Sequence, residues 1–352
     1  MRNKTEKDTV SIHRCYCMFI PPRVLDNLAA AGVMGAPLSA NQSKLSRKKR
    51  AERVKDMKEF GSLTPVGKAS RQVYDCQHQW VQRVNLVRPE GDPVTGDESV
   101  DKMYDYAGNV RNYFKKVLNR DSIDNASMDL ILNVHFGENY MNAFWDGDEM
   151  TFGDGDGNIF ISFAKSLDVV AHELGHGVTQ WEADLVYQDQ SGALNEHFSD
   201  VFGSAITQHV EKQTADSADW LIGDEIMGPT LKGEALRSMS EPGSAYDNTL
   251  MGMDPQPSHM RDIYTGPDDN GGVHINSGIF NKAFYLASKD IGTDKAVVVW
   301  YNALQNLWPT ANFNDAVKVI VRAAGILTDS GQVPKGSPQR IRAAFKAVGL
   351  PT

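Results

Sequence analysis

Apolar side chains recur at helical spacing in the second half of the chain, from Leu167 onward. Residues three or four positions apart share one face of a helix, so this spacing predicts amphipathic helices. The segments that show it span residues 166–182, 193–210, 278–288, 295–307 and 338–348. We expect a mainly α-helical C-terminal lobe.

Between about Gln72 and Phe163 the pattern becomes strand-like. Short apolar and alternating runs at residues 81–87 and 130–134 are broken by Gly and Asp turns, which is typical of strands. No internal repeat or long low-complexity tract separates the two halves. We expect this part of the chain to be β-rich.

A chain of 352 residues is too long for one ordinary core, so the two patterns predict two lobes. The expected fold is α+β, with a β-rich N-terminal lobe at residues 58–167 and a helical lobe at 168–352. The helix at 166–182 lies at the junction and belongs to both. A cleft between two lobes commonly binds substrate.

Residues 1–57 differ from the rest: an apolar patch ends at Pro21-Pro22, an Ala/Gly stretch follows, and then the basic run 46–50. We interpret this region as a separate leader segment. The apolar patch is too short for a secretory signal, so we expect synthesis in the cytoplasm without a signal peptide and any export by a leaderless route.

Charge and hydropathy exclude several partners. The net charge of -9 provides no basic field for nucleic acid or an anionic membrane, and no apolar run is long enough to span a bilayer. We expect a monomer that binds neither. The three cysteines, Cys15, Cys17 and Cys76, are too few for a disulfide framework, and we expect surface or half-buried thiols.

The candidate chemistry lies in the stretch His172-Glu173-Leu174-Gly175-His176 within the predicted junction helix. Histidines four apart stand one turn above each other, so both imidazoles can face one metal ion. Glu173 can accept a proton from a water on that metal. The alternative is a solvated helix face that happens to carry two histidines.

A catalytic zinc usually has three protein ligands and one open position. Glu196, twenty positions after His176, is the best candidate for the third ligand, and Asp200 lies one helical turn later, where it can hold a ligand histidine. The longer zinc pattern, in which the third ligand is a histidine, needs a glycine and a histidine where this chain has Thr179 and Glu182, so that pattern is excluded.

These residues, together with Asn270-Gly271-Gly272-Val273-His274, resemble the thermolysin family of zinc metallopeptidases over roughly residues 72–352. The leader around Pro21-Pro22 resembles the short propeptide of the protealysin-like subgroup, although Arg23 interrupts its apolar run. Removal of such a propeptide would occur between Ser43 and Lys68.

The resemblance implies a zinc-dependent neutral endopeptidase that cleaves internal peptide bonds, before bulky hydrophobic residues, with Glu173 as general base. It implies that His274, oriented by Asp269, and Tyr187 face the oxyanion that forms on the attacked carbonyl. A preplaced donor is what that oxyanion needs. Taken alone, His274 would be an ordinary loop histidine and Tyr187 a packing residue.

The same resemblance gives peptide-binding roles to Asn142, the Ala143 carbonyl and Arg237. Asn142 and Ala143 would align an extended peptide by strand addition, and Arg237 would donate to a substrate carbonyl. The alternatives are a plain strand end and a buried ion pair. The propeptide would inhibit the enzyme, assist folding, or both.

Calcium is where the chain departs from the family. Asp168, Asp219 and Asp224 align with calcium ligands, but Thr207 and Leu221 stand where carboxylates are expected. Because calcium needs several oxygen ligands, the sequence favours at most one ion over a two-ion cluster.

Three alternatives stay open at this stage. The first alternative is an inactive peptide-binding protein that keeps the metal, although intact Glu173 and His274 argue against it. An aminopeptidase would need a site for a free amino terminus, and the chain has no Gly-x-Met-Glu-Asn stretch. Cys17 as a thiolate cap on the zinc is disfavoured because histidine and glutamate ligands already satisfy the metal.

Overall fold

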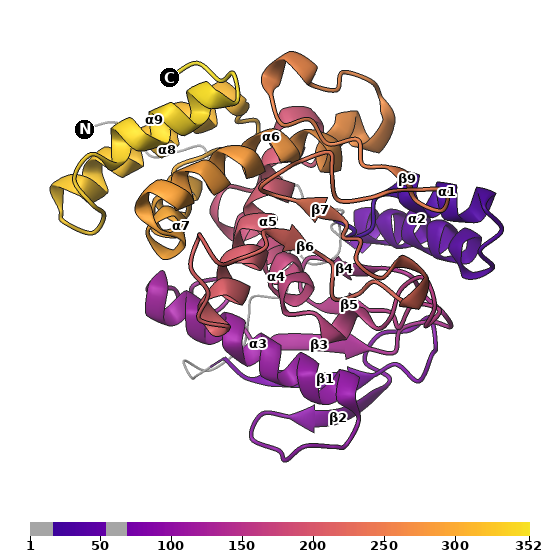
Figure 1. The fold of residues 1–352 in the computed structure, drawn as a ribbon. Coiled ribbons are helices and arrows are strands. Elements are labelled where there is room, and N and C mark those ends of the chain that lie inside the picture. The colour runs from indigo at the N-terminus through magenta and orange to yellow at the C-terminus, as the bar shows by residue number, and fades with distance from the viewer. Residues whose placement is uncertain (1–16, 54–68) are drawn as a thin grey trace, which may run out of the picture.

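The computed structural model of the chain describes residues 17–53 and 69–352 (Figure 1). Residues 1–16 and 54–68 lie outside the described residues, and with them Cys15 and the boundary predicted at 57/58. The side chains of the basic run 46–50 are also outside the described part.

A five-stranded mixed sheet forms the N-terminal lobe, with strand order β2-β1-β3-β5-β4. β1 pairs in parallel with β3, and β3 with β5, whereas the two outer pairs are antiparallel. β4 is therefore an edge strand. The strands are β1 (Arg71–Asp75), β2 (Asn85–Pro89), β3 (Leu130–Val134), β4 (Ala143–Trp145) and β5 (Met150–Phe152).

The strand predicted at 130–134 is confirmed as β3, whereas the one predicted at 81–87 is wrong in its bounds. The pairing with β1 begins only at Asn85, because Arg83 adopts a left-handed backbone (φ 56°) that ends any extended run before it.

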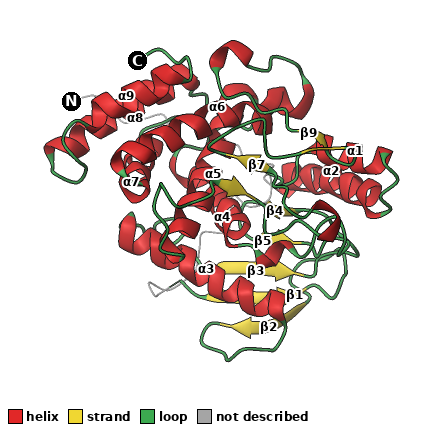
Figure 2. Cartoon of the chain, in the orientation of Figure 1, coloured by secondary structure: helices red, strands yellow, loops and turns green. Residues whose placement is uncertain are grey.

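A 20-residue helix, α3 (Glu98–Val117), lies inside the segment that we predicted to be β-rich, so that part of the prediction is wrong. Asp97 caps the helix by accepting from the backbone N–H groups of Ser99 and Val100. The buried residues of α3 recur at helical spacing, and the helix packs across the sheet (Figure 2). They include Val100, Met103, Tyr104, Ala107, Val110 and Phe114.

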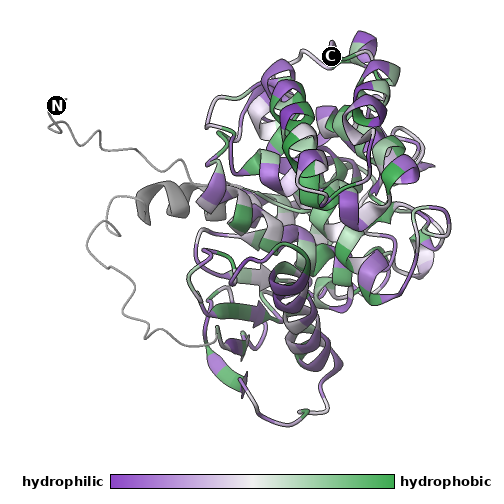
Figure 3. Ribbon diagram, turned by 90° about the vertical axis from the view of Figure 1, so that its left-hand side faces the viewer, coloured by the Kyte–Doolittle hydropathy of each residue, from purple (hydrophilic) through white to green (hydrophobic). Residues whose placement is uncertain are grey.

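Helices build the C-terminal lobe, as predicted, and they confirm all five predicted segments. Hydrophilic residues mark their outward faces, and hydrophobic residues gather where they meet (Figure 3). One helix, α8, was not predicted. The helices are α4 (Leu167–Glu182), α5 (Asp189–Val210), α6 (Asp268–Ile291), α7 (Thr293–Leu304), α8 (Phe313–Asp329) and α9 (Ser337–Ala347).

The junction helix α4 packs against α5, α3 and β4, so it joins the two lobes. Its residues from Leu167 to Thr179 are all buried. Two short ribbons complete the lobe: β6 (Leu221–Ile222) pairs with β7 (Arg237–Ser238), and β8 (Asp247–Asn248) pairs with β9 (Gly252–Met253). The α+β class, with a helical lobe on a sheet, is confirmed.

The leader forms its own pair of helices, α1 (Pro22–Ala30) and α2 (Gly35–Arg53), beside the sheet edge (Figure 1). Proline at the first helical position of α1 fits its fixed φ. The residues just before α1, Cys17 to Ile20, are fully buried. No helix in residues 17–53 or 69–352 is long and apolar enough to cross a membrane.

Candidate metal centre and peptide-binding cleft

His172 and His176 stand one turn apart on α4, and both side chains are fully buried. Their Nε2 atoms lie 3.0 Å apart. The other ring nitrogens are held by α5: His172 Nδ1 lies 2.9 Å from Asp200 Oδ1, and His176 Nδ1 lies 2.8 Å from Asn195 Oδ1. Because each Nδ1–H donates to an oxygen, both Nε2 lone pairs point at the same space.

Two lone pairs that face each other in a dry interior repel, and a cation between them removes the repulsion. Burial lowers the pKa of His176 to about 3, which keeps the ring in the neutral form that a metal binds. Burial also lowers the pKa of His172, but the carboxylates of Asp200 and Glu196 outweigh it and raise the pKa to about 9. A bound cation would take the place of that proton.

Glu196 on α5 brings a carboxylate to the same space. Its Oε2 lies 3.5 Å from His172 Nε2, and its Oε1 lies 3.5 Å from His176 Nε2. Burial raises the pKa of this carboxyl, but the neighbouring imidazoles of His274, His176 and His172 hold the pKa well below its usual range. Among the described residues Oε2 is buried with no hydrogen-bond partner.

Two imidazole nitrogens and one carboxylate oxygen are the donor set of a catalytic zinc site that keeps one position open. The buried, unbonded Glu196 Oε2 and the facing lone pairs of His172 and His176 both fit such an ion. The structure thus brings together the three ligands predicted from sequence, with Asp200 behind one of them. Glu173, next to His172 on α4, is fully buried in the same region.

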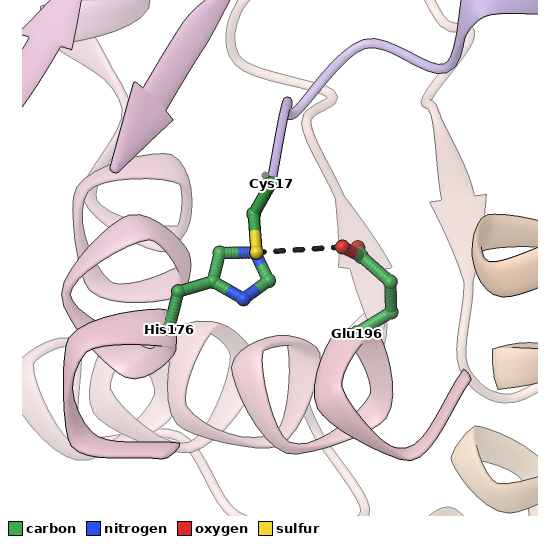
Figure 4. Close-up of side chains that lie close together, drawn as sticks. All are labelled: Cys17, His176 and Glu196. Carbon is green, nitrogen blue, oxygen red and sulfur yellow. Dashed lines mark ion pairs between the residues drawn. The ribbon is translucent and has the colours of Figure 1, made fainter. Parts of the chain in front are cut away.

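Cys17 of the leader lies over this site (Figure 4). Its sulfur and one ligand atom each of His176 and Glu196 all lie within 4.8 Å of one another. Cys17 is disulfide-bonded, and Cys76 is a buried free thiol. The expectation of surface or half-buried thiols is wrong for both, because both are fully buried. A disulfide sulfur is not a thiolate, which disfavours the capping hypothesis further.

The leader runs through the cleft as an extended peptide beside β4. Phe19 N–H donates to the Ala143 carbonyl at 3.1 Å, and Ile20 N–H donates to Asn142 Oδ1 at 2.8 Å. Asn142 Nδ2 donates in return to the Ile20 carbonyl at 3.4 Å. Asn142 and Ala143 therefore align the leader backbone at the sheet edge, in the way that the resemblance implies for a substrate.

The carbonyl that precedes Phe19 meets His274. The His274 Nε2 atom lies 2.9 Å from the Met18 carbonyl oxygen, and the His274 Nδ1 atom lies 2.6 Å from Asp269 Oδ1. Both ring nitrogens thus face oxygen acceptors. Burial lowers the pKa of His274, but the charges of Asp269 and Glu196 outweigh it and raise the pKa above its usual value. The His274 ring is therefore placed to donate from Nε2 to a peptide carbonyl.

Two local features place this histidine and its neighbour. Residues Asp269 to Gly272 leave helical geometry, and Asp269 adopts φ 54°, so that its carboxylate folds back onto the His274 ring and backbone N–H. The Tyr187 hydroxyl donates to Glu196 Oε1 and lies 3.3 Å from His274 Nε2. The residues that the resemblance assigns to the oxyanion, His274, Asp269 and Tyr187, therefore form one connected group.

The Phe19 side chain is fully buried, and we call the space that it occupies the Phe19 pocket. Its ring packs edge-on against His172 at 5.1 Å and against Phe163 at 6.4 Å between ring centroids. Gly223, at the end of β6, forms the pocket floor: an added Cβ would lie 3.1 Å from the Phe19 ring and from Leu236. The pocket accepts a bulky side chain because this position has none.

Arg237 on β7 links the peptide to the metal ligands. Its Nη1 lies 3.5 Å from the Phe19 carbonyl oxygen, and its guanidinium stands 5.0 Å from the ring centroid of the same residue. Its Nε and Nη2 donate to Asp200 at 2.9 and 2.8 Å. Asp200 in turn holds His172, so the peptide contact and the ion pair that we weighed as alternatives occur together.

Asp168, Asp219 and Asp224, which align with calcium ligands, are neighbours, but hydrogen bonds already occupy the carboxylate of Asp168. Burial, Asp168 and Asp219 raise the pKa of Asp224 to about 7. The Asp168 carboxylate accepts from the backbone N–H groups of Val169 and Gly223 at 2.7 and 2.6 Å. The crowding of carboxylates fits a cation, whereas these bonds already satisfy Asp168, so a single calcium ion stays a prediction.

Sequence reasoning missed some residues of the site. Asn195, which holds His176, lies directly before Glu196 on the same helix turn. That position could have indicated its role beside a ligand histidine. Met18, Phe19 and Ile20 were placed in the leader but not in the cleft, and nothing in their pattern specified the register.

Comparisons with known proteins identify one family over most of the chain. The family described as thermolysin metallopeptidase, catalytic domain, matches residues 41–180, and its α-helical domain matches residues 183–350.

Two relatives and one solved structure illustrate the similarity. An extracellular metalloprotease of Pectobacterium carotovorum subsp. carotovorum is 46% identical over 294 residues, which cover 83% of this chain and 85% of that protein. A thermolysin of Alicyclobacillus acidocaldarius subsp. acidocaldarius is 43% identical over 263 residues, 72% of this chain and 45% of that protein. The solved structure of the precursor of protealysin, a metalloproteinase from Serratia proteamaculans, has a TM-score of 0.83 and 38% identity, and covers 95% of this chain and 100% of that one.

Proposed function

The chain belongs to the thermolysin family of zinc metalloendopeptidases, and from that premise we propose that it cleaves internal peptide bonds, before bulky apolar residues, in the cleft that its leader occupies. The observation that carries the proposal is the contact between His274 Nε2 and the Met18 carbonyl oxygen, at 2.9 Å. This contact places a peptide carbonyl beside the candidate metal ligands.

The leader supports the proposal because it is bound in the manner of a substrate. If Met18 stands for the residue before the cleaved bond, Phe19 stands for the residue after it. Three backbone groups of this pair then have partners: His274 for one carbonyl, Arg237 for the next, and Ala143 for the N–H between them. Strand addition fixes the register of the peptide.

The residues around the bond then have defined roles. When bound to His172, His176 and Glu196, zinc supplies Lewis-acid chemistry and lowers the pKa of water. Glu173 accepts the proton of the attacking water and passes it to the nitrogen of the cleaved bond.

The developing oxyanion meets two donors. His274 donates from Nε2, and Asp269 orients its ring and stabilises its positive charge. The Tyr187 hydroxyl lies 3.3 Å from that nitrogen and donates to Glu196 Oε1 in this structure; it would turn its proton to the oxyanion when the Glu196 carboxylate holds the metal.

The preference for a bulky apolar residue after the cleaved bond follows from the Phe19 pocket. The ring is fully buried between Phe163, His172 and the floor at Gly223. Burying such a side chain favours binding by roughly 1.5–3 kcal/mol.

The leader itself acts as an inhibitory propeptide, and the enzyme is made as a precursor. Its residues Met18 to Ile20 block the cleft, and helix α1 secures them through Val24, Leu25 and Leu28, which are buried. Asn27 Nδ2 also donates to the Met251 carbonyl at 2.6 Å. Removal of the leader would open the cleft. Residues 1–57 are thus proposed as propeptide, and 58–167 and 168–352 as the catalytic lobes.

The test is the variant Glu173→Gln, which keeps shape and loses the base. We expect turnover of an end-blocked peptide to fall by roughly 10²–10⁴-fold while zinc content stays stoichiometric. Glu211→Gln, an exposed glutamate at the end of α5, is the matched control and should keep full activity.

Unchanged turnover in the Glu173 variant would contradict the general-base role. An aminopeptidase would leave the blocked peptide intact, and a protein that only binds peptides would leave it intact even with native Glu173.

A further inference from the structure

Outside the cleft, two histidines and an aspartate converge from the segments that follow β1, β3 and β5. His135 Nδ1 lies 2.8 Å from Asp154 Oδ2, and His78 Nδ1 lies 3.5 Å from the same oxygen. The three ligand atoms all lie within 4.8 Å of one another. Zinc ligands at about 2.0–2.2 Å from a tetrahedral ion are roughly 3.4 Å apart, so small side-chain movements make room for an ion.

A second carboxylate holds the ring of His135 from behind. Asp97 Oδ2 lies 3.1 Å from His135 Nε2, while its Oδ1 caps α3 by accepting from Ser99 N–H at 2.9 Å. A carboxylate that accepts from Nε2–H leaves the Nδ1 lone pair for a metal. Because the same aspartate is fixed by the helix, the orientation of His135 is fixed as well.

Two further observations point to a ligand rather than to a plain ion pair. Among the described residues Asp154 Oδ1 is buried with no hydrogen-bond partner, although its other oxygen has two histidines beside it. His78 and His135 both adopt left-handed backbone conformations, with φ 57° and 53°. Such conformations are costly for residues other than glycine and cluster at sites that clamp ligands.

We propose that His78, His135 and Asp154 form a second divalent-metal site, distinct from the cleft, that takes zinc. The donors are two imidazole nitrogens and a carboxylate, which suit zinc and other borderline cations and not calcium. His78 is 61% exposed, so an ion reaches the site from solvent.

A metal ion bound at this site would affect the loop that carries Trp80. His78 belongs to a loop that carries Trp80, and Trp80 packs edge-on against Phe136 and Tyr140 at 5.6 Å. That aromatic cluster also encloses Met18 of the leader. An ion bound to His78 and His135 ties the loop to the end of β3, and thereby fastens one wall around Met18.

The competing account is an ion pair alone, in which a protonated His135 sits between Asp154 and Asp97. The two accounts differ in one measurable quantity, the binding of a second equivalent of zinc. The ion pair needs no metal, and His78 adds to it only a longer contact with Asp154, at 3.5 Å.

The experiment is a calorimetric titration of the full chain with Zn²⁺, after removal of metal, with Glu173→Gln in every sample to prevent self-digestion. We expect two equivalents in this parent protein. His78→Ala should lose the second equivalent or bind it at least tenfold more weakly. The matched control is His209→Ala, because His209 is also exposed and paired with one aspartate, Asp294, at 3.0 Å.

A finer variant tests the orientation of His135. Asp97→Asn keeps the helix cap, since Asn caps as well as Asp, but weakens the hold on Nε2. We expect zinc at this site to bind roughly 10–100-fold more weakly. A parent protein that binds one equivalent, a His78→Ala variant that keeps two, or unchanged affinity in Asp97→Asn would overturn the site. Loss of the cleft zinc alone would leave the second equivalent in place.

Discussion

Gly223→Ala should change which residue the enzyme accepts after the cleaved bond. An added Cβ would lie 3.1 Å from one atom of the Phe19 ring and 3.2 Å from the next, whereas carbon atoms prefer about 3.5–4.0 Å. The ring cannot move sideways easily, because Phe163 and His172 pack against it. Leu236 lies 3.1 Å away on the other side of the new methyl group.

Overpacking of this kind costs roughly 1–3 kcal/mol. At about 1.4 kcal/mol for each factor of ten, kcat/KM for a peptide with Phe after the cleaved bond should fall roughly 5- to 150-fold. A peptide with Ala at that position does not reach the pocket floor and should be cleaved as before. The assay compares two end-blocked peptides that differ only there, with the processed enzyme.

The substitution also strains the backbone, because Gly223 has φ 75°, where alanine costs roughly 1–2 kcal/mol. Gly233→Ala controls for that strain: Gly233 has φ 93° and nothing within 4 Å of its added Cβ. Both variants should lose similar stability, but only the first should change the Phe-to-Ala preference. An unchanged preference in Gly223→Ala would refute the assignment of the pocket.

Three other perturbations have expected outcomes. Phe19→Ala removes a fully buried leader side chain whose packing contributes roughly 3–5 kcal/mol. The unprocessed precursor should therefore gain peptide-cleaving activity by roughly 100-fold or more. A precursor that stays inactive would show that the leader does not inhibit through this pocket. Asp269→Asn should lower kcat by up to about 10²-fold with little change in KM, since it weakens a donor to the oxyanion, and a rise in KM alone would speak for a binding role. Burial lowers the pKa of His135, but Asp154 and Asp97 outweigh it and raise the pKa to about 9. In chelator-treated protein, protonated His135 therefore stabilises the fold fully below about pH 6.5, and this contribution is lost as the pH rises through about 9. After allowance for solvent screening we expect a loss on the order of 1–2 kcal/mol in urea unfolding, and a His135→Asn variant with the same pH profile would contradict it.

The local patterns predicted much of the fold and most of the metal centre. A helix that carries His172 and His176 four residues apart fixes their relative direction by its own geometry, and Glu196 lies on the next helix, close in sequence. The helix α3 was missed although its apolar residues have helical spacing, because we extended a strand-like interpretation across neighbours at 81–87 and 130–134.

Other contacts depend on long-range packing that no local pattern specifies. Phe19 meets Ala143 and Arg237 across more than a hundred residues of chain, and its register depends on how α1 docks. His78 and His135 are likewise distant in sequence, and their left-handed backbones belong to loops whose conformation follows from the β1 and β3 pairing. Composition and periodicity carry no information about either meeting.

Asp200 performs two tasks at once, and this limits how such an enzyme can diversify. One carboxylate steadies the His172 imidazole and also anchors the guanidinium of Arg237, which grips the peptide backbone. A lineage that altered the backbone grip would therefore disturb metal retention in the same step. A change in substrate specificity is more easily acquired at a position that does not also support the metal site, such as Gly223, which has no side chain.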